Sequence, residues 1–257
     1  MQDANYNFFI KKIREKTGLD LGSYKEQQMH RRIRQLMHRY GTQDFQEFLT
    51  MLDKDQGIFE KFTNYLTINT SQFFRDSIVY RALETKILPE LITSGSLKVW
   101  SAGCSIGAEP YSLAIMLSEQ AQHKSWQILA TDIDRNILVK AIEGKYAKDI
   151  LGNVPKHYLE RYFSSNDGIF QVNDSIKRTV KFRYQNLLTD HFEKGFNLIL
   201  CRNVFIYFTQ EVQQTLINQF CQSLKPGGFF IVGCSEIITT IKDNGLIRIQ
   251  PAIYQKI

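Results

Sequence analysis

Hydrophobic positions divide the chain into two parts near residue 70. In residues 1–68 the apolar side chains recur three and four positions apart, which predicts helices only. Breaks between these helices are predicted at residues 18–22, 40–42 and 53–57. The second helix has one clear apolar stripe, formed by Met29, Ile33, Leu36, Met37 and Tyr40. We therefore expect an all-helical N-terminal domain at residues 1–68.

From about residue 78 the pattern alternates between helical segments and short β-rich runs, as is typical of an α/β sheet with crossover helices. Strands are predicted at residues 97–101, 127–131, 180–185, 196–201 and 228–233, and a terminal hairpin at residues 246–250 and 253–256. Helices are predicted at residues 108–122, 135–143 and 210–223, the last one ended by Lys225-Pro226-Gly227-Gly228. The predicted fold is a doubly wound, mostly parallel sheet at residues 76–257.

One region interrupts this alternation, at about residues 158–185. Short β-like pieces at residues 168–172 and 178–184 lie near a polar turn at residues 164–168. We expect a small antiparallel β-subdomain inserted there.

Composition restricts the number of domains, the cellular location and the possibility of a metal site. A chain of 257 residues can bury one large core and one accessory core. No apolar run approaches the roughly 20 residues that span a bilayer, and the first residues, MQDANYNFFIKK, lack a signal-peptide pattern, so we expect a cytoplasmic protein that does not insert into membranes. The four cysteines have neither CxxC spacing nor a nearby histidine, so we expect no metal site.

Positive charge is concentrated in one segment. Residues 11–39 contain nine basic and three acidic residues, which accounts for the whole net charge of +6. On the second helix, Arg31, Arg34 and His38 fall opposite the apolar stripe, whereas Arg32 and Arg39 lie on a flank. This face is either a docking surface or merely a solvated side of the helix.

The candidate chemistry begins at residues 100–112, which read WSAGCSIGAEPYS and join a predicted strand to a helix. Gly103 and Gly107 let the backbone approach a ligand closely, as in a nucleotide-cofactor loop. The next strand ends at Asp132, where a carboxylate can accept hydrogen bonds from ribose hydroxyls. Asp132 could instead cap the following helix. Glu109, in the first helical turn, could be a capping group or could supply negative charge to a cationic cofactor.

Further polar residues follow other strands of the predicted sheet. Loops at one edge of a doubly wound sheet converge, so Gly103, Asp132, Asn186 and Arg202 should face one crevice. Asn186 could reach adenine or could simply form a turn.

Five ordered motifs resemble those of the CheR-type chemotaxis receptor methyltransferases, over nearly the whole chain. They are NTSQFFR at residues 69–75, residues 101–112, ATDID at residues 130–134, NLL at residues 186–188 and CRNVFIYF at residues 201–208. The resemblance implies a class I methyltransferase-like fold, S-adenosylmethionine as the cofactor, S-adenosylhomocysteine as its product, and esterification of glutamate side chains on bacterial chemoreceptors.

The resemblance also implies roles for individual residues. Catalytic roles fall on Arg75, Tyr207 and Arg202. Cofactor binding falls on Asn69, Ser71, Arg75, Ala102, Gly103, Glu109, Asp132, Asn186, Leu187, Arg202 and Asn203. The family's loop reads closer to STGEEPYS, so this chain departs from it at Ile106 and Ala108, which puts its cofactor affinity in doubt.

The partner implied by the resemblance is the cytoplasmic helical bundle of chemoreceptors, with the chain acting as a monomer. The family's helical domain docks on acidic methylation helices, which assigns receptor docking to Arg31, Arg32, Arg34 and Arg39. Some members also grip a receptor peptide with the β-subdomain. The short turn at residues 164–168 resembles members that work without that tether.

Two other functions stay open on the residues alone. The first is a signalling module that binds the cofactor without catalysis, against which Arg75, Arg202 and Tyr207 speak. The second is a nucleic-acid methyltransferase, motivated by the basic helix. Base-amino methylation commonly uses an Asn-Pro-Pro-aromatic turn after the fourth strand, whereas residues 201–204 read CRNV, so we expect no nucleic-acid partner.

Overall fold

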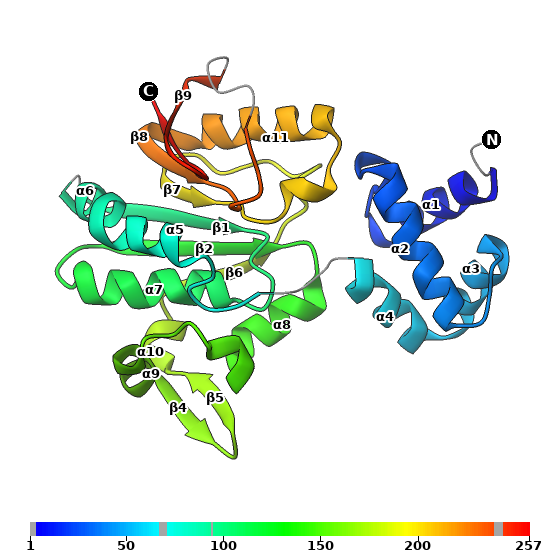
Figure 1. Cartoon of the computed structure of the whole chain (residues 1–257), viewed down its shortest axis with the longest axis horizontal. Coiled ribbons are helices and arrows are strands. Elements are labelled where there is room, and N and C mark those ends of the chain that lie inside the picture. Colours follow the sequence, from blue (N-terminus) through cyan, green and yellow to red (C-terminus); the bar gives the residue numbers. More distant parts are fainter. Residues whose placement is uncertain (1–3, 67–70, 94, 239–243) are drawn as a thin grey trace. The chain divides into compact units, whose positions relative to one another are not determined.

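The computed structural model describes residues 4–66, 71–93, 95–238 and 244–257. The chain forms two compact units. Unit 1 comprises Met1–Asn69 together with Ile206–Gln213, and unit 2 comprises Thr70–Phe205 together with Gln214–Ile257. Figure 1 labels the elements of both units along the chain.

The N-terminal part of unit 1 is helical, as the hydrophobic pattern predicts. Its elements are α1 (Ala4–Thr17), the 3-10 turn η1 (Leu21–Ser23), α2 (Glu26–Arg39), α3 (Phe45–Lys54) and α4 (Gln56–Leu66). Each predicted break coincides with a helix boundary. The start of α3 is held by Asp44, whose side chain accepts hydrogen bonds from the backbone N–H groups of Gln46 and Glu47.

Aromatic side chains fill the core of unit 1. Phe9 is fully buried, and its ring lies 5.3 Å from Phe45, 6.0 Å from Phe48 and 5.9 Å from Phe62, measured between ring centroids. The predicted apolar stripe of α2 faces inward, since Met29, Ile33, Leu36 and Met37 are buried and Tyr40 is half-buried at the helix end.

A segment from much later in the chain completes unit 1. The backbone N–H of Lys25 donates to the carbonyl of Tyr207 at 2.8 Å, and that of Thr209 donates to the carbonyl of Ser23 at 3.1 Å. The rings of Tyr24 and Phe208 lie 5.0 Å apart. Residues 206–213 therefore belong with the N-terminal helices, an arrangement that hydrophobic periodicity does not predict.

Unit 2 contains a seven-stranded sheet with the order β6-β2-β1-β7-β8-β10-β9. The strands are β1 (Leu97–Ala102), β2 (Trp126–Asp132), β6 (Val180–Tyr184), β7 (Phe196–Leu200), β8 (Leu224–Ile231), β9 (Leu246–Gln250) and β10 (Ile253–Lys256). The first five named pair in parallel, and β10 is antiparallel to both β8 and β9. The predicted doubly wound, mostly parallel sheet is confirmed.

Helices connect the parallel strands. Before the sheet lie α5 (Ser77–Ala82), the π-helical turn η2 (Leu83–Ile87) and α6 (Leu88–Thr93). The crossovers within it contain α7 (Ala108–Gln120), α8 (Arg135–Glu143), the 3-10 turn η4 (Phe205–Tyr207) and α11 (Gln210–Ser223). As predicted, α8 and α11 end at Glu143 and Ser223. However, the Lys225–Gly228 stretch after α11 lies within β8 as an irregular part of the strand, because Phe196 pairs with Leu224 and Leu198 already pairs with Phe229.

The central strands are buried on both faces, as expected for a parallel sheet covered by helices. All five residues of β7 are buried. Trp100 of β1 lies within 5.3 Å of the rings of Phe192, Phe196 and Phe220, and its indole N–H donates to the Thr131 hydroxyl at 2.9 Å. This contact ties β1 to β2 directly before the loops that follow them.

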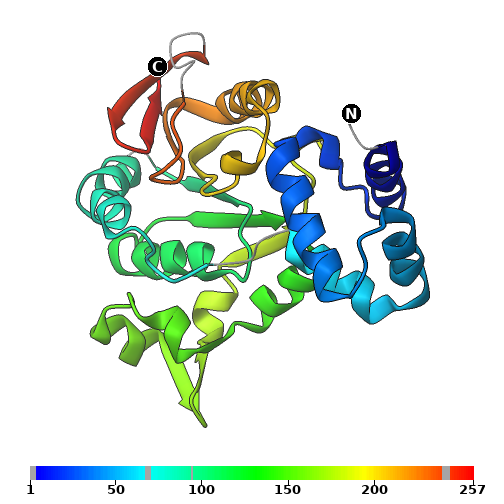
Figure 2. The same ribbon diagram turned by 45° about the vertical axis from the view of Figure 1, so that its right-hand side comes forward.

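The predicted β-subdomain exists, but only one of its two predicted pieces, residues 168–172, belongs to it. It is a three-stranded antiparallel sheet of order β3-β5-β4, with β3 at Lys145–Ala147, β4 at Phe163–Asn166 and β5 at Ile169–Val172. The same region contains the 3-10 turn η3 (Lys148–Leu151), α9 (Lys156–Tyr162) and α10 (Asp174–Lys177). Strands β4 and β5 form a hairpin that projects in both views (Figure 1 and Figure 2).

The assignment of residues 178–184 to this antiparallel sheet is wrong. Val180–Tyr184 forms β6, which pairs in parallel with β2 from Ile128 to Asp132. The third antiparallel strand is β3, directly after α8, so the subdomain begins earlier than predicted. Three residues are too few for an alternating pattern to reveal a strand.

Phe9 and Phe8 provide a matched test of the unit 1 core. Phe9→Ala removes a fully buried ring and should lower the free energy of unfolding by about 3–5 kcal/mol. Phe8 is 44% exposed, so Phe8→Ala should change it by less than about 0.5 kcal/mol. Urea unfolding followed by circular dichroism at the helix band measures both. Equal losses in the two variants would contradict this description of the core.

Candidate functional site

The loop between β1 and α7 has a backbone that only small residues adopt readily. Gly103, Ser105 and Gly107 all have positive φ, at 75°, 51° and 86°. The N–H groups of Gly103 and Cys104 both donate to the carbonyl of Thr131, at 2.8 and 2.9 Å. A Cβ at Gly103 would lie 2.7 Å from the Cγ2 of Val204. The loops after β1, β2 and β7 therefore meet at Gly103.

Asp132, at the end of β2, holds these loops together. Its Oδ2 accepts from the backbone N–H of Ser105 at 2.8 Å, and its Oδ1 accepts from that of Asp134 at 3.0 Å. The side chain is buried, and this burial raises the pKa of Asp132 from 3.8 to about 6. Each carboxylate oxygen has further lone pairs, so the group can also accept hydrogen bonds from ligand hydroxyls.

The alternative interpretation of Asp132 as a helix cap is wrong. The cap of α8 is Asp134, whose side chain accepts from the backbone N–H groups of Asn136 at 2.9 Å and Ile137 at 3.1 Å. Asp132 is the last residue of β2 and is not used to cap α8.

Arg202, which follows β7, lies in a buried cluster of charges. Its Nη1 donates to Oε2 of Glu109 at 3.1 Å. Its Nη2 donates to Oδ2 of Asp76 at 2.6 Å and to the carbonyl of Arg75 at 2.9 Å. The second carboxylate oxygen of Glu109 accepts from the hydroxyl of Ser101 at 2.7 Å. Glu109 is therefore an ion-pair partner inside the site and not merely a group at the start of α7.

The charge of Arg202 is maintained by its neighbours. Burial by itself would lower the pKa of Arg202, but the carboxylates of Glu109 and Asp76 and the hydroxyl of Tyr80 reverse this effect and raise it. The side chain is only 4% exposed, and its Nε is buried without a hydrogen-bond partner. A buried donor without a partner costs free energy.

Asn203 is held in a left-handed conformation by a residue that the sequence motifs did not single out. Its φ is 61°, and its backbone N–H donates to Oε2 of Glu236 at 2.9 Å. The same oxygen accepts from the N–H of Gly233 at 2.5 Å. A Cβ at Gly233 would lie 2.8 Å from both Asn203 and Glu236, so this approach requires glycine.

Asn186 forms a turn after β6. Its Oδ1 accepts from the backbone N–H of Leu188 at 2.9 Å, and its own N–H donates to Oδ2 of Asp190 at 2.9 Å. Leu187, the residue that follows Asn186 in the chain, is buried. The preceding residue, Gln185, donates its N–H to the carbonyl of Asp132 at 3.0 Å, so this turn adjoins the loop after β2. The turn-forming interpretation of Asn186 therefore holds, and it leaves adenine binding possible.

The remaining predicted site residues have different surroundings. Ala102 is fully buried at the end of β1, and Ser71 and Arg75 are half-buried. Tyr207 is half-buried in unit 1, whereas Arg75 and Arg202 belong to unit 2. Asn69 lies outside the described residues.

The four arginines assigned to docking are not equivalent. Arg32 donates to the carbonyl of Tyr65, and its guanidinium lies 4.5 Å from the centre of that ring. Arg39 lies 5.5 Å from the same ring, and Arg34 donates to the carbonyl of Gln43 at 2.9 Å while lying over Phe45. Arg31 is exposed. Arg32 and Arg34 therefore also hold unit 1 together.

Tyr146 of β3 supports the loop at Ile106, the first of its two departures from the family pattern. Its hydroxyl donates to the carbonyl of Ile106 at 2.7 Å. Ala108 is fully buried, and its carbonyl accepts from the hydroxyl of Ser112 at 2.7 Å. Ser112 in turn accepts from the backbone N–H of Phe74 at 3.1 Å. Like Asp76 and Glu236, Tyr146 carries no local sequence signal, because each acts through tertiary contacts.

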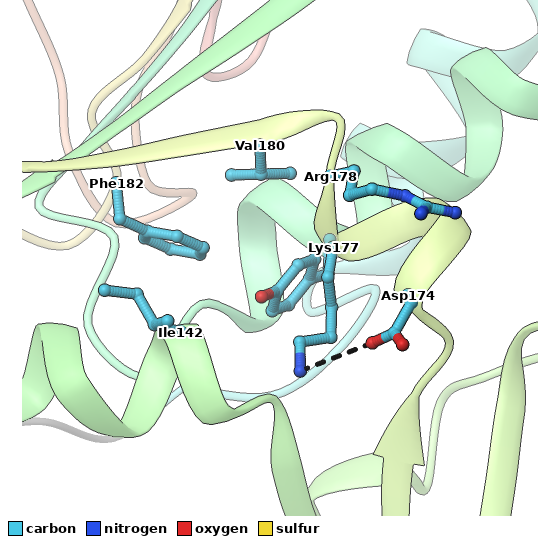
Figure 3. A pocket seen from close by; sticks show the side chains of 7 residues that line it. Ile142, Asp174, Lys177, Arg178, Val180 and Phe182 are labelled. Atoms are coloured by element: carbon cyan, nitrogen blue, oxygen red, sulfur yellow. Dashed lines mark ion pairs between the residues drawn. The ribbon is translucent and has the colours of Figure 1, made fainter.

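A separate pocket of about 350 Å³ lies near β6 and α10. Figure 3 shows Ile142, Val180 and Phe182 on one side of it and Asp174, Lys177 and Arg178 on the other. None of the predicted site residues lines this pocket. However, Phe182 lies 3.3 Å from where a Cβ of Gly107 would be, so its wall also supports the loop after β1.

Two features are not found in the part of the chain that the structure describes. No three His, Cys, Asp or Glu residues there are grouped so that they could bind a metal ion. No helix there combines the length and the apolar composition needed to cross a membrane.

Comparison with known proteins gives two family matches that together cover most of the chain. Residues 69–251 match the model described as "CheR methyltransferase, SAM binding domain". Residues 4–67 match "CheR methyltransferase, all-alpha domain". S-adenosylmethionine is therefore the cofactor of unit 2.

Curated relatives align over nearly their full length. The chemotaxis protein methyltransferase of Listeria monocytogenes is 38% identical over 256 residues, covering 99% of this chain and 98% of the relative. That of Borreliella burgdorferi is 35% identical, covering 96% and 92%. That of Escherichia coli is 32% identical, covering 96% and 89%.

Solved structures with similar folds are more distant. PKMT2 from Rickettsia typhi in complex with AdoHcy has a TM-score of 0.35 at 20% identity, covering 53% of this chain and 20% of that chain. A SAM-dependent methyltransferase from Methanosarcina mazei has a TM-score of 0.35 at 13% identity, covering 58% and 57%. At these values the likeness carries no argument about function.

The raised pKa of Asp132 predicts how ligand binding depends on pH. We expect the ionised carboxylate to accept from ribose hydroxyls, so the affinity for S-adenosylhomocysteine should be constant above the pKa of about 6. As the pH falls through 6, the carboxylate is protonated and the affinity should decrease, by up to about tenfold per pH unit. Isothermal titration calorimetry at pH 5 to 8 measures this. Asp132→Asn should bind weakly at every pH, and a wild-type affinity that does not change between pH 5 and 8 would refute the assignment.

Proposed function

The chain belongs to the CheR methyltransferase family, and from that premise we propose that it transfers the methyl group of S-adenosylmethionine to glutamate carboxylates of bacterial chemoreceptors. The observation that carries this proposal is the match of both parts of the chain, at residues 4–67 and 69–251, to the two domains of that family. Relatives named chemotaxis protein methyltransferase align over nearly the whole chain and support the same function.

The residues of unit 2 fit this cofactor. Asp132 supplies acceptors for the ribose hydroxyls, and Arg202 is proposed to contribute its positive charge near the carboxylate of the methionine part. Glu109 supplies negative charge near the amino group of the cofactor. In the proposal the remaining contacts come from Asn69, Ser71, Arg75, Ala102, Gly103, Asn186, Leu187 and Asn203.

When bound, the cofactor supplies an electrophilic methyl group on a sulfonium. A glutamate side chain has a pKa near 4.3, so it is almost fully ionised at neutral pH and attacks without a general base. Orientation therefore dominates, and an aligned arrangement of reacting atoms can contribute about 7–11 kcal/mol. Excluding water favours the reaction further, because an anion and a cation are both neutralised in the transition state.

Arg75 of unit 2 is proposed to orient the receptor glutamate, and a catalytic role is proposed separately for Tyr207 of unit 1. The guanidinium of Arg75 can hold a carboxylate with two hydrogen bonds, and the hydroxyl of Tyr207 can donate one. Arg202 is less suited to this task, because both of its terminal nitrogens already donate to Glu109, Asp76 and the carbonyl of Arg75. We assign Arg202 to the cofactor and to the position of Arg75.

The receptor's helical bundle is the proposed partner of α2. Acidic residues on methylation helices would be attracted to the basic face of α2, which increases the rate of encounter more than the final affinity. Arg31 and Arg39 are exposed and can meet the partner directly, whereas Arg32 and Arg34 are half-buried and donate to backbone carbonyls of unit 1. A receptor substrate of this kind places the reaction in the cytoplasm.

The product of the reaction tests the proposed chemistry. With methyl-labelled cofactor and a receptor cytoplasmic fragment, the protein should label the fragment, and mild base should release the label as volatile methanol, because only carboxyl methyl esters hydrolyse in this way. A fragment with its methylation-site glutamates replaced by glutamine is the control and should stay unlabelled. Binding of the cofactor without labelling would favour a non-catalytic module. Base-stable label on added nucleic acid would favour the other alternative.

Reversal of charge on α2 tests the docking surface. Arg31→Glu should raise the KM for the receptor fragment about fivefold or more at low salt and leave the Kd for S-adenosylhomocysteine within about twofold. The difference from wild type should shrink as salt is added. Lys86→Glu, an equal charge change at an exposed residue of unit 2, is the control. If both variants raise the KM equally, the effect is one of net charge and the docking assignment fails.

A further inference from the structure

Asp76 does not behave like an ordinary residue at the start of a helix. It directly precedes α5 and has a left-handed backbone, with φ of 64° and ψ of 75°. Its side chain makes no hydrogen bond to the N–H groups of that helix. Instead, Oδ2 accepts from Nη2 of Arg202 at 2.6 Å. The carboxylate is therefore used for the site and not for capping α5.

With only one anionic partner, Arg202 would form a neutral pair that gives a cationic cofactor no net attraction. S-adenosylmethionine has a net charge of +1, because its sulfonium and amino group outweigh its carboxylate. Glu109 alone would only neutralise Arg202. Asp76 adds a second carboxylate, so the cluster of Glu109, Asp76 and Arg202 is negative overall.

Net negative charge matters because the reaction removes a positive charge from the cofactor. S-adenosylhomocysteine lacks the sulfonium and has a net charge of zero, although it keeps nearly all other groups of the cofactor. Hydrogen bonds to the ribose, adenine and methionine carboxylate are shared by both molecules. A carboxylate that acts through its charge therefore distinguishes them, whereas a group that acts through shape does not.

We infer that Asp76 is a specificity-determining residue, which shifts the affinity ratio toward the cationic cofactor and away from its neutral product. It acts through its charge beside Arg202 and does not need to touch the sulfonium. Because Asp76 is partly exposed and its charge is screened by solvent, we expect the loss of that charge to change the affinity ratio by about fivefold. Product release is thereby favoured after each transfer.

The backbone of Asp76 allows a clean substitution. Asparagine tolerates the left-handed region about as well as aspartate and keeps an oxygen that can accept from Arg202, so Asp76→Asn removes mainly the charge. Glycine also tolerates this conformation, so Asp76→Gly removes the side chain without straining the turn. The exposed Asp174, which pairs only weakly with Lys177 at 3.7 Å, offers a matched loss of charge in Asp174→Asn.

The experiment measures dissociation constants of the full-length protein for S-adenosylmethionine, S-adenosylhomocysteine and sinefungin, a cofactor analogue with a cationic amine at the reacting position. Isothermal titration calorimetry gives all three without any receptor. In Asp76→Asn the ratio of the cofactor Kd to the product Kd should rise about fivefold. The ratio of the sinefungin Kd to the product Kd should rise by a similar factor. Asp174→Asn should leave both ratios within about twofold of wild type.

An equal loss of affinity for all three ligands would overturn the inference, because a merely structural role weakens binding without changing the ratio. If Asp76→Asn does not fold, Asp76→Gly gives the same ratio test. The inference depends on the cofactor and not on the identity of the methyl acceptor. Failure to methylate receptor glutamates would therefore refute the proposed function and leave this ratio unaffected.

Discussion

The buried guanidinium of Arg202 is the constraint on which the site depends. An uncompensated charge in the interior is costly, and removing one partner of such a pair is strongly destabilising. Arg202 meets this constraint with three acceptors from two other segments, namely Glu109 at the start of α7, Asp76, and the carbonyl of Arg75. The segment before α5, the loop after β1 and the loop after β7 are thus fixed relative to one another by a single side chain.

A second carboxylate organises the other half of the site. Asp132 accepts from backbone N–H groups after both β1 and β2, and Gly103 donates back to the carbonyl of Thr131. These bonds bring the turn at Gly103 within van der Waals contact of Val204. The polar groups that we propose bind the cofactor are therefore held in place by the protein itself, which lowers the ordering cost of binding. Asp132 therefore organises a part of the site that accepts hydrogen bonds from backbone N–H groups, and Arg202 organises a part built from ion pairs.

The sequence predicted the strands of the sheet and the site residues that follow them well. It did not predict the residues that hold those site residues in place through tertiary contacts. Strands with continuous apolar runs, such as Phe196–Leu200, stand out because their burial follows directly from composition. Asp132 and Arg202 could be placed because they follow such strands. Asp76 and Glu236 could not, since nothing local distinguishes an acidic residue that pairs across the fold from one in water. The strand at Lys145–Ala147 was missed for a similar reason, because its three residues are defined by their partners in Ile169–Gln171.

The departures at Ile106 and Ala108 can now be explained in part. The backbone carbonyl of Ile106 is held by the hydroxyl of Tyr146, so the loop conformation does not require a hydroxyl in side chain 106. Ala108 is fully buried, and a carboxylate there would need partners that the site already commits to Glu109. Two adjacent carboxylates would also repel each other at the start of α7. In this chain the two carboxylates beside Arg202 are those of Glu109 and Asp76, and Asp76 reaches the guanidinium from a different segment.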